Sequence, residues 1–208
     1  MDDDMLKGKL VRLVASVQQD EAEAIVRWSA NFVYRRLCST DVPLQYSTKK
    51  YKEWLEKDAE KDPPSFNFFS IHTLEDDRLI GGISLDEGAY PSGETFVGIG
   101  IGDPADWGKG YGTDAMNIIL RYAFEEMNLR RVALDTFEYN PRGVRSYEKA
   151  GFVHEGRMRG FLHREGRRWE VRVRTKSEWE LLPVGENRER MRTVRPPGYE
   201  PDPFEMSE

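Results

Sequence analysis

The feature that most constrains this chain is a glycine-rich segment placed directly before an apolar, helix-like run. From Trp107 to Leu120 the chain reads WGKGYGTDAMNIIL, with glycines at positions 108, 110 and 112. Glycine adopts dihedral angles that side chains disfavour and lets a ligand approach the main chain closely. The first amides of a helix lack partners, and the helix dipole adds about half a positive charge there. The segment therefore predicts a ligand that carries phosphate, the alternative being a structural turn without a ligand.

Two common nucleotide-binding motifs do not fit this segment. A P-loop needs four residues between its first glycine and Gly-Lys, followed by Ser or Thr. Here five residues separate Gly102 from Gly108, and Lys109 is followed by Gly110. A dinucleotide fingerprint needs G-x-G-x-x-G, whereas the spacing here is G-x-G-x-G. These mismatches argue against ATP and against a dinucleotide as the ligand.

Hydrophobic patterning predicts one mixed α/β domain with a central, mostly antiparallel sheet of about seven strands, flanked by about four helices. Strands are expected at residues 9–15, 65–73, 78–85, 95–102, 130–139, 152–159 and 169–175. Helices are expected at 16–28, where Ser16 and Gln19 fit a capping box, and at 48–61, 110–128 and 141–150. In the strand at 95–102, glycines at 98, 100 and 102 leave one face bare. We expect a ligand to lie against that backbone.

The length and composition limit the class of protein. The 208 residues suit a single domain at 1–182 followed by a proline-rich, charged tail at 183–208, either disordered or an arm on a neighbouring subunit. The net charge of −6 gives no support for a nucleic-acid partner. No apolar run reaches the roughly 18 residues that span a membrane. The N-terminal residues do not resemble a secretory signal.

Cysteine and histidine usage narrows the chemistry further. The single cysteine, Cys38, cannot form an internal disulfide, which fits the reducing cytoplasm. It is a bystander thiol or a catalytic one. The three histidines, His72, His154 and His163, lack the spacing of metal ligands, so no metal is expected.

A second motif follows the next predicted strand and reads NPRGVRSYEKAGF from Asn140 to Phe152. Together with WGKGYGTDA, it resembles the GNAT family of acyl-CoA N-acyltransferases, in the branch of ribosomal-protein N-terminal and polyamine acetyltransferases. The resemblance covers about residues 8–182 and is carried mainly by residues 98–152. It implies the GNAT fold and acetyl-CoA as cosubstrate, without a metal. It also implies acetyl transfer to a primary amine, on a protein N-terminus or a small molecule, by direct attack through a tetrahedral intermediate, and a homodimer.

The resemblance also implies where acetyl-CoA binds. The family's pyrophosphate loop has Gln or Arg where this chain has Trp107, so the backbone amides of residues 108–113 are expected to bind the phosphates. The strand before the loop is expected to splay from its neighbour, and amides near Ile99 and Ile101 to pair with the pantetheine. Asn140 matches an asparagine that touches this arm, although it also fits a helix N-cap. The implied cofactor-binding residues are Ile99, Gly100, Ile101, Trp107, Gly108, Lys109, Gly110, Tyr111, Gly112, Thr113, Asn140 and Tyr147.

The family resemblance also implies catalytic residues, of which the general acid has a match in this chain and the general base does not. Tyr147 matches the family's general acid, which protonates the departing CoA thiolate, the alternative being a core aromatic. The family's glutamate base corresponds to Phe96, and Glu94 is the nearest carboxylate and our candidate base. Asp103 and Glu138 are further candidates.

The acceptor and the activity have alternatives. At pH 7 an α-amine with a pKa of about 8 is roughly a tenth neutral, whereas a lysine-like amine near 10.4 is neutral at only about one part in 2,500. A site without a firm base therefore favours α-amines. A polyamine acetyltransferase and a non-enzymatic acyl-CoA sensor are the alternative functions.

Overall fold

The computed structural model describes residues 5–15, 21–41, 47–59, 66–86 and 93–177. The chain divides into two units, residues 1–176 and 177–208, and apart from Ser177 the second unit lies outside the described residues. The expected capping box at Ser16 and Gln19 and the expected tail also lie outside them. The boundary at residue 182 therefore stays a prediction.

The described elements follow the predicted order, with one helix added. The strands are β1 (Val11–Val14), β2 (Phe66–Thr73), β3 (Leu79–Asp86), β4 (Glu94–Ile101), β5 (Arg131–Phe137), β6 (Val153–Arg164) and β7 (Arg167–Ser177). The helices are α1 (Glu21–Ser29), α2 (Phe32–Cys38), α3 (Thr48–Ala59), α4 (Tyr111–Arg121) and α5 (Pro141–Lys149). A π-helical turn at Tyr122–Glu126 continues α4. None of the helices described here has the length and hydrophobicity needed to cross a membrane.

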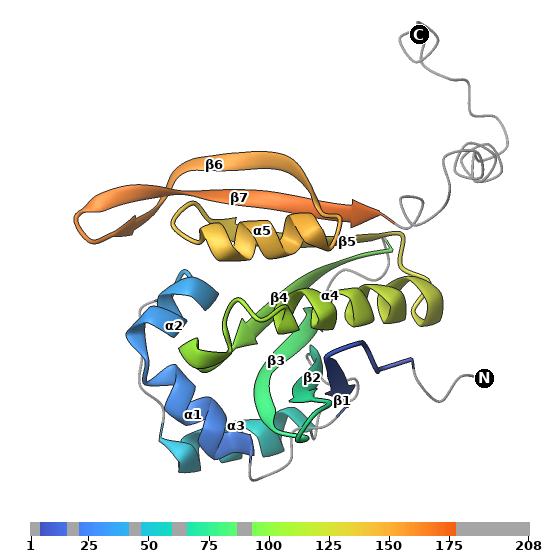
Figure 1. Cartoon of the computed structure of the whole chain (residues 1–208). Coiled ribbons are helices and arrows are strands. Elements are labelled where there is room, and N and C mark those ends of the chain that lie inside the picture. Colours follow the sequence, from blue (N-terminus) through green and yellow to red (C-terminus); the bar gives the residue numbers. More distant parts are fainter. Residues whose placement is uncertain (1–4, 16–20, 42–46, 60–65, 87–92, 178–208) are drawn as a thin grey trace, which may run out of the picture. The chain divides into compact units, whose positions relative to one another are not determined.

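The added helix, α2, was missed by the sequence analysis although the chain carries a signal for it. Asn31 is its N-cap, and its side-chain oxygen accepts hydrogen bonds from the amides of Val33 and Tyr34. Asparagine is among the preferred N-cap residues because this bond satisfies free amides of the first turn. The helix α2 packs with α1, which in turn packs with α3 (Figure 1).

One sheet holds all seven strands in the order β1-β2-β3-β4-β5-β7-β6 (Figure 1). β1–β2, β2–β3, β3–β4 and β6–β7 pair antiparallel, whereas β4 and β5 run parallel. The parallel pairing covers only Glu94, Thr95 and Phe96 of β4, while β4 stays paired with β3 as far as Ile101. The second half of β4 therefore separates from β5 and leaves a gap, as the family resemblance implied. The architecture confirms the predicted fold class.

The two faces of β4 meet different parts of the protein. Ile99 and Ile101 pack against the main core, which the sheet forms with α4. On the opposite face, a Cβ atom added to Gly100 would lie 2.4 Å from the Tyr34 hydroxyl, and one added to Gly102 would lie 1.9 Å from the Trp28 ring. Aromatic side chains of α1 and α2 thus cover the bare face at Gly100 and Gly102, so the ligand expected there has room only toward Gly98, and its contact with this face stays a prediction.

The start of α4 is fixed to the N-terminal part of the domain by Asp114. Its carboxylate accepts hydrogen bonds from the amides of Lys9 (3.2 Å), Leu10 (2.7 Å) and Val11 (3.0 Å). A carboxylate that accepts several backbone amides is held firmly, because each bond is charge-assisted. The glycine-rich segment therefore leads into a helix whose first turn has a fixed position.

Candidate functional site

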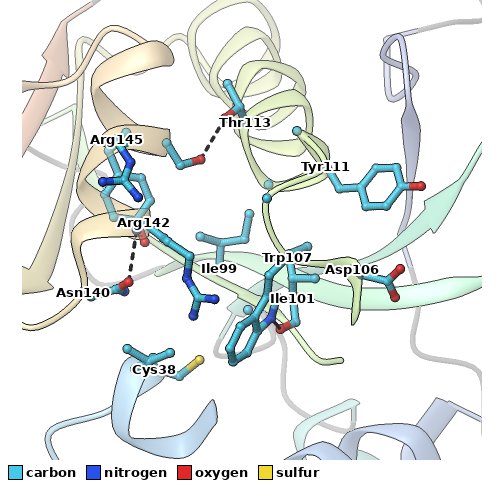
Figure 2. A pocket seen from close by; sticks show the side chains of 18 of the residues that line it. Cys38, Ile99, Ile101, Asp106, Trp107, Tyr111, Thr113, Asn140, Arg142 and Arg145 are labelled. Atoms are coloured by element: carbon cyan, nitrogen blue, oxygen red, sulfur yellow. Dashed lines mark hydrogen bonds between the residues drawn. The ribbon is translucent and has the colours of Figure 1, made fainter. Parts of the chain in front are cut away.

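A cavity of about 410 Å³ opens where the glycine-rich segment, β4 and α5 meet (Figure 2). All the predicted cofactor-binding residues except Lys109 line it. The structure thus brings together residues from four elements that the sequence analysis assigned to one site. Their contact with acetyl-CoA stays a prediction.

The glycine-rich segment presents free amides to this cavity. Gly108 and Gly110 have φ angles of +79° and +93°, in the left-handed region that favours glycine, and Gly110 is the N-cap of α4. Within the described part of the chain, the amides of residues 108–113 have no hydrogen-bond acceptor. A Cβ atom on Gly108 would meet nothing within 4 Å, so the backbone is open there. Free amides at a helix start are the arrangement that binds phosphate.

The main chain of β4 offers further donors to the cavity. The Gly102 amide donates to the Ile80 carbonyl at 2.9 Å, so the main-chain groups of Gly102 face β3. Backbone groups alternate along a strand, so those of Ile99 and Ile101 face the gap toward β5. The Ile101 carbonyl there accepts a hydrogen bond from the Trp107 indole at 2.7 Å. The two amides that the family resemblance assigned to the pantetheine therefore face the gap.

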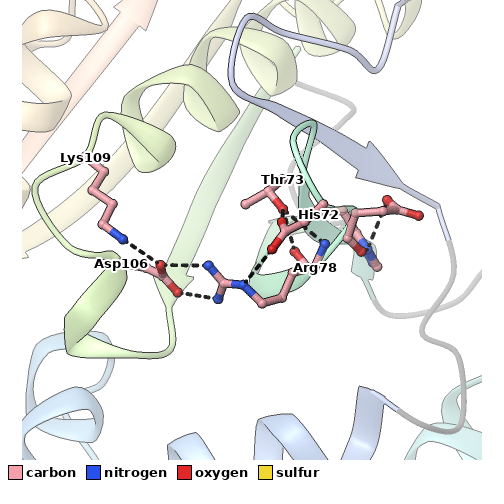
Figure 3. Close-up of polar contacts among 7 residues, drawn as sticks. His72, Thr73, Arg78, Asp106 and Lys109 are labelled. Carbon is pink, nitrogen blue, oxygen red and sulfur yellow. Dashed lines mark hydrogen bonds and ion pairs between the residues drawn. The ribbon is translucent and has the colours of Figure 1, made fainter.

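Lys109 takes part in an ion-pair network around the buried carboxylate of Asp106, beside the cavity (Figure 3). Its ammonium lies 3.3 Å from Asp106, and the Arg78 guanidinium contacts both oxygens of the same carboxylate at 2.7 and 3.0 Å. Asp106 is only 3% exposed, and the hydrogen bond from Arg78 is the main cause that lowers the pKa of its carboxyl. The network fixes the short 3₁₀ turn Pro104–Asp106 that leads into the glycine-rich segment.

Two arginines of α5 line the cavity and were missed as candidates. The Arg142 guanidinium lies 3.9 Å from the centre of the Trp107 ring, and Arg145 follows one turn later (Figure 2). Residues three apart share one side of a helix. The motif NPRGVRSY therefore carried a signal for them, because it places both arginines close to the predicted phosphate site.

Asn140 and Thr113 have structural roles that the structure shows directly. The Asn140 side-chain oxygen accepts a hydrogen bond from the Gly143 amide at 3.0 Å, so it caps α5. The Thr113 and Ser146 hydroxyls lie 2.8 Å apart and connect α4 with α5. Both Asn140 and Thr113 line the cavity as well. The N-cap alternative for Asn140 is confirmed, and its contact with acetyl-CoA stays a prediction.

A second cavity of about 210 Å³ adjoins the first. It is lined by residues 37–40 at the end of α2, residues 97–99 of β4, Asp135 and Phe137 of β5, and Tyr147. Leu37, Cys38, Ile99 and Tyr147 line both cavities. The two cavities therefore meet at the gap between β4 and β5.

Tyr147 lies at this junction. Its ring packs edge-on against Phe152, with the ring centres 6.2 Å apart. Burial, then the neighbouring Cys38 and Asp135, raise the pKa of its phenol above the usual value. Among the described residues its hydroxyl has no hydrogen-bond partner. Tyr147 thus presents a protonated, unpaired phenol to both cavities.

Cys38 also lies at the junction, at the end of α2 (Figure 2). Although the residue is exposed, desolvation by its surroundings raises the pKa of its thiol to about 11. The thiolate is the nucleophilic form of cysteine. Because the thiol keeps its proton at neutral pH, the structure favours the bystander role.

The candidate bases named from sequence lie outside both cavities. Glu94 forms ion pairs with Arg130 and with Arg131 (3.3 Å). Asp103 accepts a hydrogen bond from the Ala105 amide, and Glu138 accepts one from the Glu170 amide. The cavities begin only where β4 leaves β5, after Phe96, so Glu94 and Phe96 precede the gap. The carboxylate that lines the second cavity is Asp135, which was not among the candidates named from sequence.

Metal ligands do not gather in the part of the chain that the structure describes. No three or more His, Cys, Asp or Glu side chains lie close enough there to hold an ion.

Comparison with known sequences gives one family. A model of the acetyltransferase (GNAT) domain matches residues 12–153, more than half of the chain. "Probable N-acetyltransferase YjcK" of Bacillus subtilis is 40% identical over 108 residues, which are 51% of this chain and 56% of that protein. Spermidine N(1)-acetyltransferase of Vibrio cholerae is 36% identical over 81 residues, 39% of this chain and 46% of its own. The chain thus spans about half the length of these relatives.

Comparison with solved structures gives the same fold. Spermidine N-acetyltransferase of Vibrio cholerae, solved in complex with CoA and spermine, matches with a TM-score of 0.72. The match covers 81% of this chain and 95% of that one at 24% identity, a likeness of fold. From the family match, the splayed strands and the glycine-rich helix start, we conclude that the chain belongs to the GNAT acetyltransferase family.

Proposed function

We propose that this protein is an acetyl-CoA-dependent N-acetyltransferase that moves an acetyl group to a primary amine. The observation that carries the proposal is the row of unpaired amides at residues 108–113, at the start of α4 and in a cavity that reaches the gap between β4 and β5. Membership of the GNAT family supports the same activity. The residues present fit acetyl-CoA, because free amides and open glycine backbone stand where phosphates need donors.

Each part of the site then has a chemical role. The amides of residues 108–113, with Arg142 and Arg145, bind the phosphates of acetyl-CoA. The amides of Ile99 and Ile101 bind its pantetheine arm and its thioester carbonyl. Acetyl-CoA supplies an activated thioester. The neutral amine nitrogen attacks the carbonyl carbon and then gives up one proton to solvent water. The tetrahedral intermediate collapses, and the C–S bond breaks with its electron pair on sulfur. Tyr147 donates a proton to that sulfur and regains one from solvent.

Two classes of amine are candidates for the acceptor. The name of one relative specifies spermidine, which supports a small amine, and a protein N-terminus remains the other candidate. The sensor alternative rested on Phe96 at the position of the base, and Phe96 is an exposed residue outside both cavities. We also propose that the enzyme works in the cytoplasm. We further propose that it forms a homodimer, and light scattering of the purified protein tests this oligomeric state.

Calorimetric titration is the first test of the cofactor. We expect acetyl-CoA to bind one-to-one and ATP not to bind. Arg142→Ala should weaken acetyl-CoA binding about tenfold, the usual cost of one charge-assisted contact. Arg159→Ala is the matched control, because Arg159 is exposed on β6 and lines neither cavity. A folded protein that does not bind acetyl-CoA would contradict the proposal.

Tyr147→Phe tests the proposed general acid. We expect kcat to fall about 100-fold without vanishing, because a positioned acid contributes at least that factor and the thiolate also leaves unassisted. The raised pKa keeps the phenol protonated, so its ionisation should reduce turnover only above about pH 10. Tyr122→Phe, outside both cavities, is the control. An unchanged kcat in Tyr147→Phe would remove the assignment.

A further inference from the structure

We infer that the second cavity is the acceptor site, and that Asp135 binds the ammonium group of an amine without an adjacent carboxylate. The inference rests on the proposed function, and it adds to it a residue that the motifs do not contain and the exclusion of free amino acids.

The position of Asp135 places it across the sheet from α4. Leu134 is buried in the core that α4 covers, and side chains alternate along a strand, so Asp135 points to the opposite face. There it lines the second cavity with the residues that end α2. Because Ile99 and Tyr147 line both cavities, an amine in the second cavity lies next to the place where the first one ends. The acceptor and acetyl-CoA would thus approach the gap from two sides.

Asp135 has no partner of its own. Among the described residues it accepts no hydrogen bond and forms no ion pair, whereas Glu94, Asp106 and Glu138 are each paired with an arginine. Although the residue is exposed, desolvation by its surroundings, and then the nearby carboxylate of Asp86, raise the pKa of its carboxyl. A desolvated carboxylate next to another acid is stabilised by a cation. An alkylammonium group supplies one, with N–H donors for a charge-assisted hydrogen bond. The bound ammonium loses one proton to solvent water before its nitrogen attacks as the neutral amine.

The negative charge of Asp135 and Asp86 also determines which amines the cavity can bind. A free amino acid carries a carboxylate on the carbon that bears its ammonium group. Asp135 and Asp86 would repel that second charge, and like charges at an interface cost several kcal/mol of binding. In place of that carboxylate, an alkylamine has only a hydrogen atom and a peptide N-terminus has a neutral amide. The cavity therefore suits alkylamines and peptide N-termini and disfavours free amino acids.

The wall of the cavity at the end of α2 is held in place by Arg164 of β6. Its guanidinium donates to the carbonyl of Ser39 at 3.2 Å and to the hydroxyl of Tyr139 at 2.6 Å. It also donates to the carbonyl of Arg36 at 3.0 Å. Ser39 lines the second cavity, so the hairpin of β6 and β7 fixes one side of the proposed acceptor site.

A matched pair of amines tests the inference. Pentylamine and norleucine share the alkyl chain and the amine and differ by the carboxylate. We expect the full-length protein to acetylate pentylamine with a kcat/KM at least about tenfold above that for norleucine. Asp135→Asn should lower kcat/KM for pentylamine about tenfold, mainly through KM, and should reduce the preference over norleucine. Glu125→Gln removes an exposed acid that lines neither cavity and should change neither value.

The outcomes separate the inference from the proposed function. If acetyl-CoA binds to the protein and Asp135→Asn keeps the wild-type ratio of the two amines, Asp135 is not the ammonium site. The inference is equally overturned if pentylamine, titrated calorimetrically into the protein saturated with CoA, does not bind. If acetyl-CoA itself does not bind, the proposed function fails instead. Asparagine has nearly the shape of aspartate, so circular dichroism should show a folded variant.

Discussion

Replacing Gly102 with alanine is expected to lower the free energy of unfolding by about 3 kcal/mol, the upper part of the usual cost of overpacking a core. The added Cβ would lie 1.9 Å from one carbon of the Trp28 indole and 2.1 and 2.4 Å from two others. Trp28 is buried, with 6% of its surface exposed. A rigid ring that is contacted at its centre cannot turn aside as the end of a flexible chain can. Either α1 or β4 must therefore shift.

Gly98→Ala is the matched control for this prediction. Gly98 lies on β4, four residues before Gly102 and on the same face, and its added Cβ would meet only the Ser84 hydroxyl at 3.4 Å. We expect its effect to stay within about 1 kcal/mol, since that distance is ordinary contact. Urea unfolding of both variants, followed by tryptophan fluorescence, measures the difference. Equal losses in the two variants would mean that glycine at these positions serves strand geometry and not the packing of Trp28.

The glycines replaced in these two variants show how much of the site could be predicted from the sequence. Glycines at alternate positions indicated a bare face on β4, but not what covers it. Trp28 and Tyr34 come from helices some 70 residues earlier, and α2, which carries Tyr34, was not predicted. Residues distant in sequence thus decided a question that the local pattern left open. At Gly100 and Gly102 the space beside the strand holds aromatic side chains, whereas at Gly98 it stays open toward the second cavity.

Local motifs served better where one continuous segment forms the site. The glycine-rich segment and the first turn of α4 are adjacent in sequence, so the residues that line the first cavity there could be named from the motif alone. The separation of β4 from β5 was expected from the family resemblance. It arises because the two strands pair at only three positions. Asp135 escaped prediction because a single acid in a buried-strand pattern carries no motif. It becomes conspicuous only when α2 and Tyr147 close a cavity around it.

Asp106→Asn is expected to cost about 2 to 3 kcal/mol of stability at pH 7, the usual worth of a hydrogen bond to a buried charge. The carboxylate accepts two hydrogen bonds from Arg78 and lies 3.3 Å from the Lys109 ammonium (Figure 3). Asparagine keeps the shape but loses the charge and one acceptor, so the Arg78 guanidinium loses half of its bidentate contact. Urea unfolding at pH 7 measures the loss.

The pH dependence of this loss identifies its cause. The hydrogen bond from Arg78, followed by contacts with Lys109, lowers the folded-state pKa of Asp106 below its unfolded value of about 3.9. The stabilisation by the charged form is therefore complete above the unfolded pKa and is lost as the pH falls through the folded one. The difference between wild type and Asp106→Asn should be full at pH 7 and 5 and should shrink below about pH 4. A difference that stays constant down to pH 3 would indicate lost packing instead of lost charge.

Asp77→Asn is the control for Asp106→Asn and shows what burial contributes. Asp77 also pairs with an arginine, Arg12 at 2.7 Å, but its side chain is 65% exposed. Exposed ion pairs contribute about 0 to 1 kcal/mol, so this variant should change stability little. Asp106 also fixes the turn before the glycine-rich segment, so its variant should weaken acetyl-CoA binding although Asp106 carries the wrong charge to bind phosphate. Tighter binding in Asp106→Asn would instead mean that the carboxylate repels the phosphates more than it positions the loop.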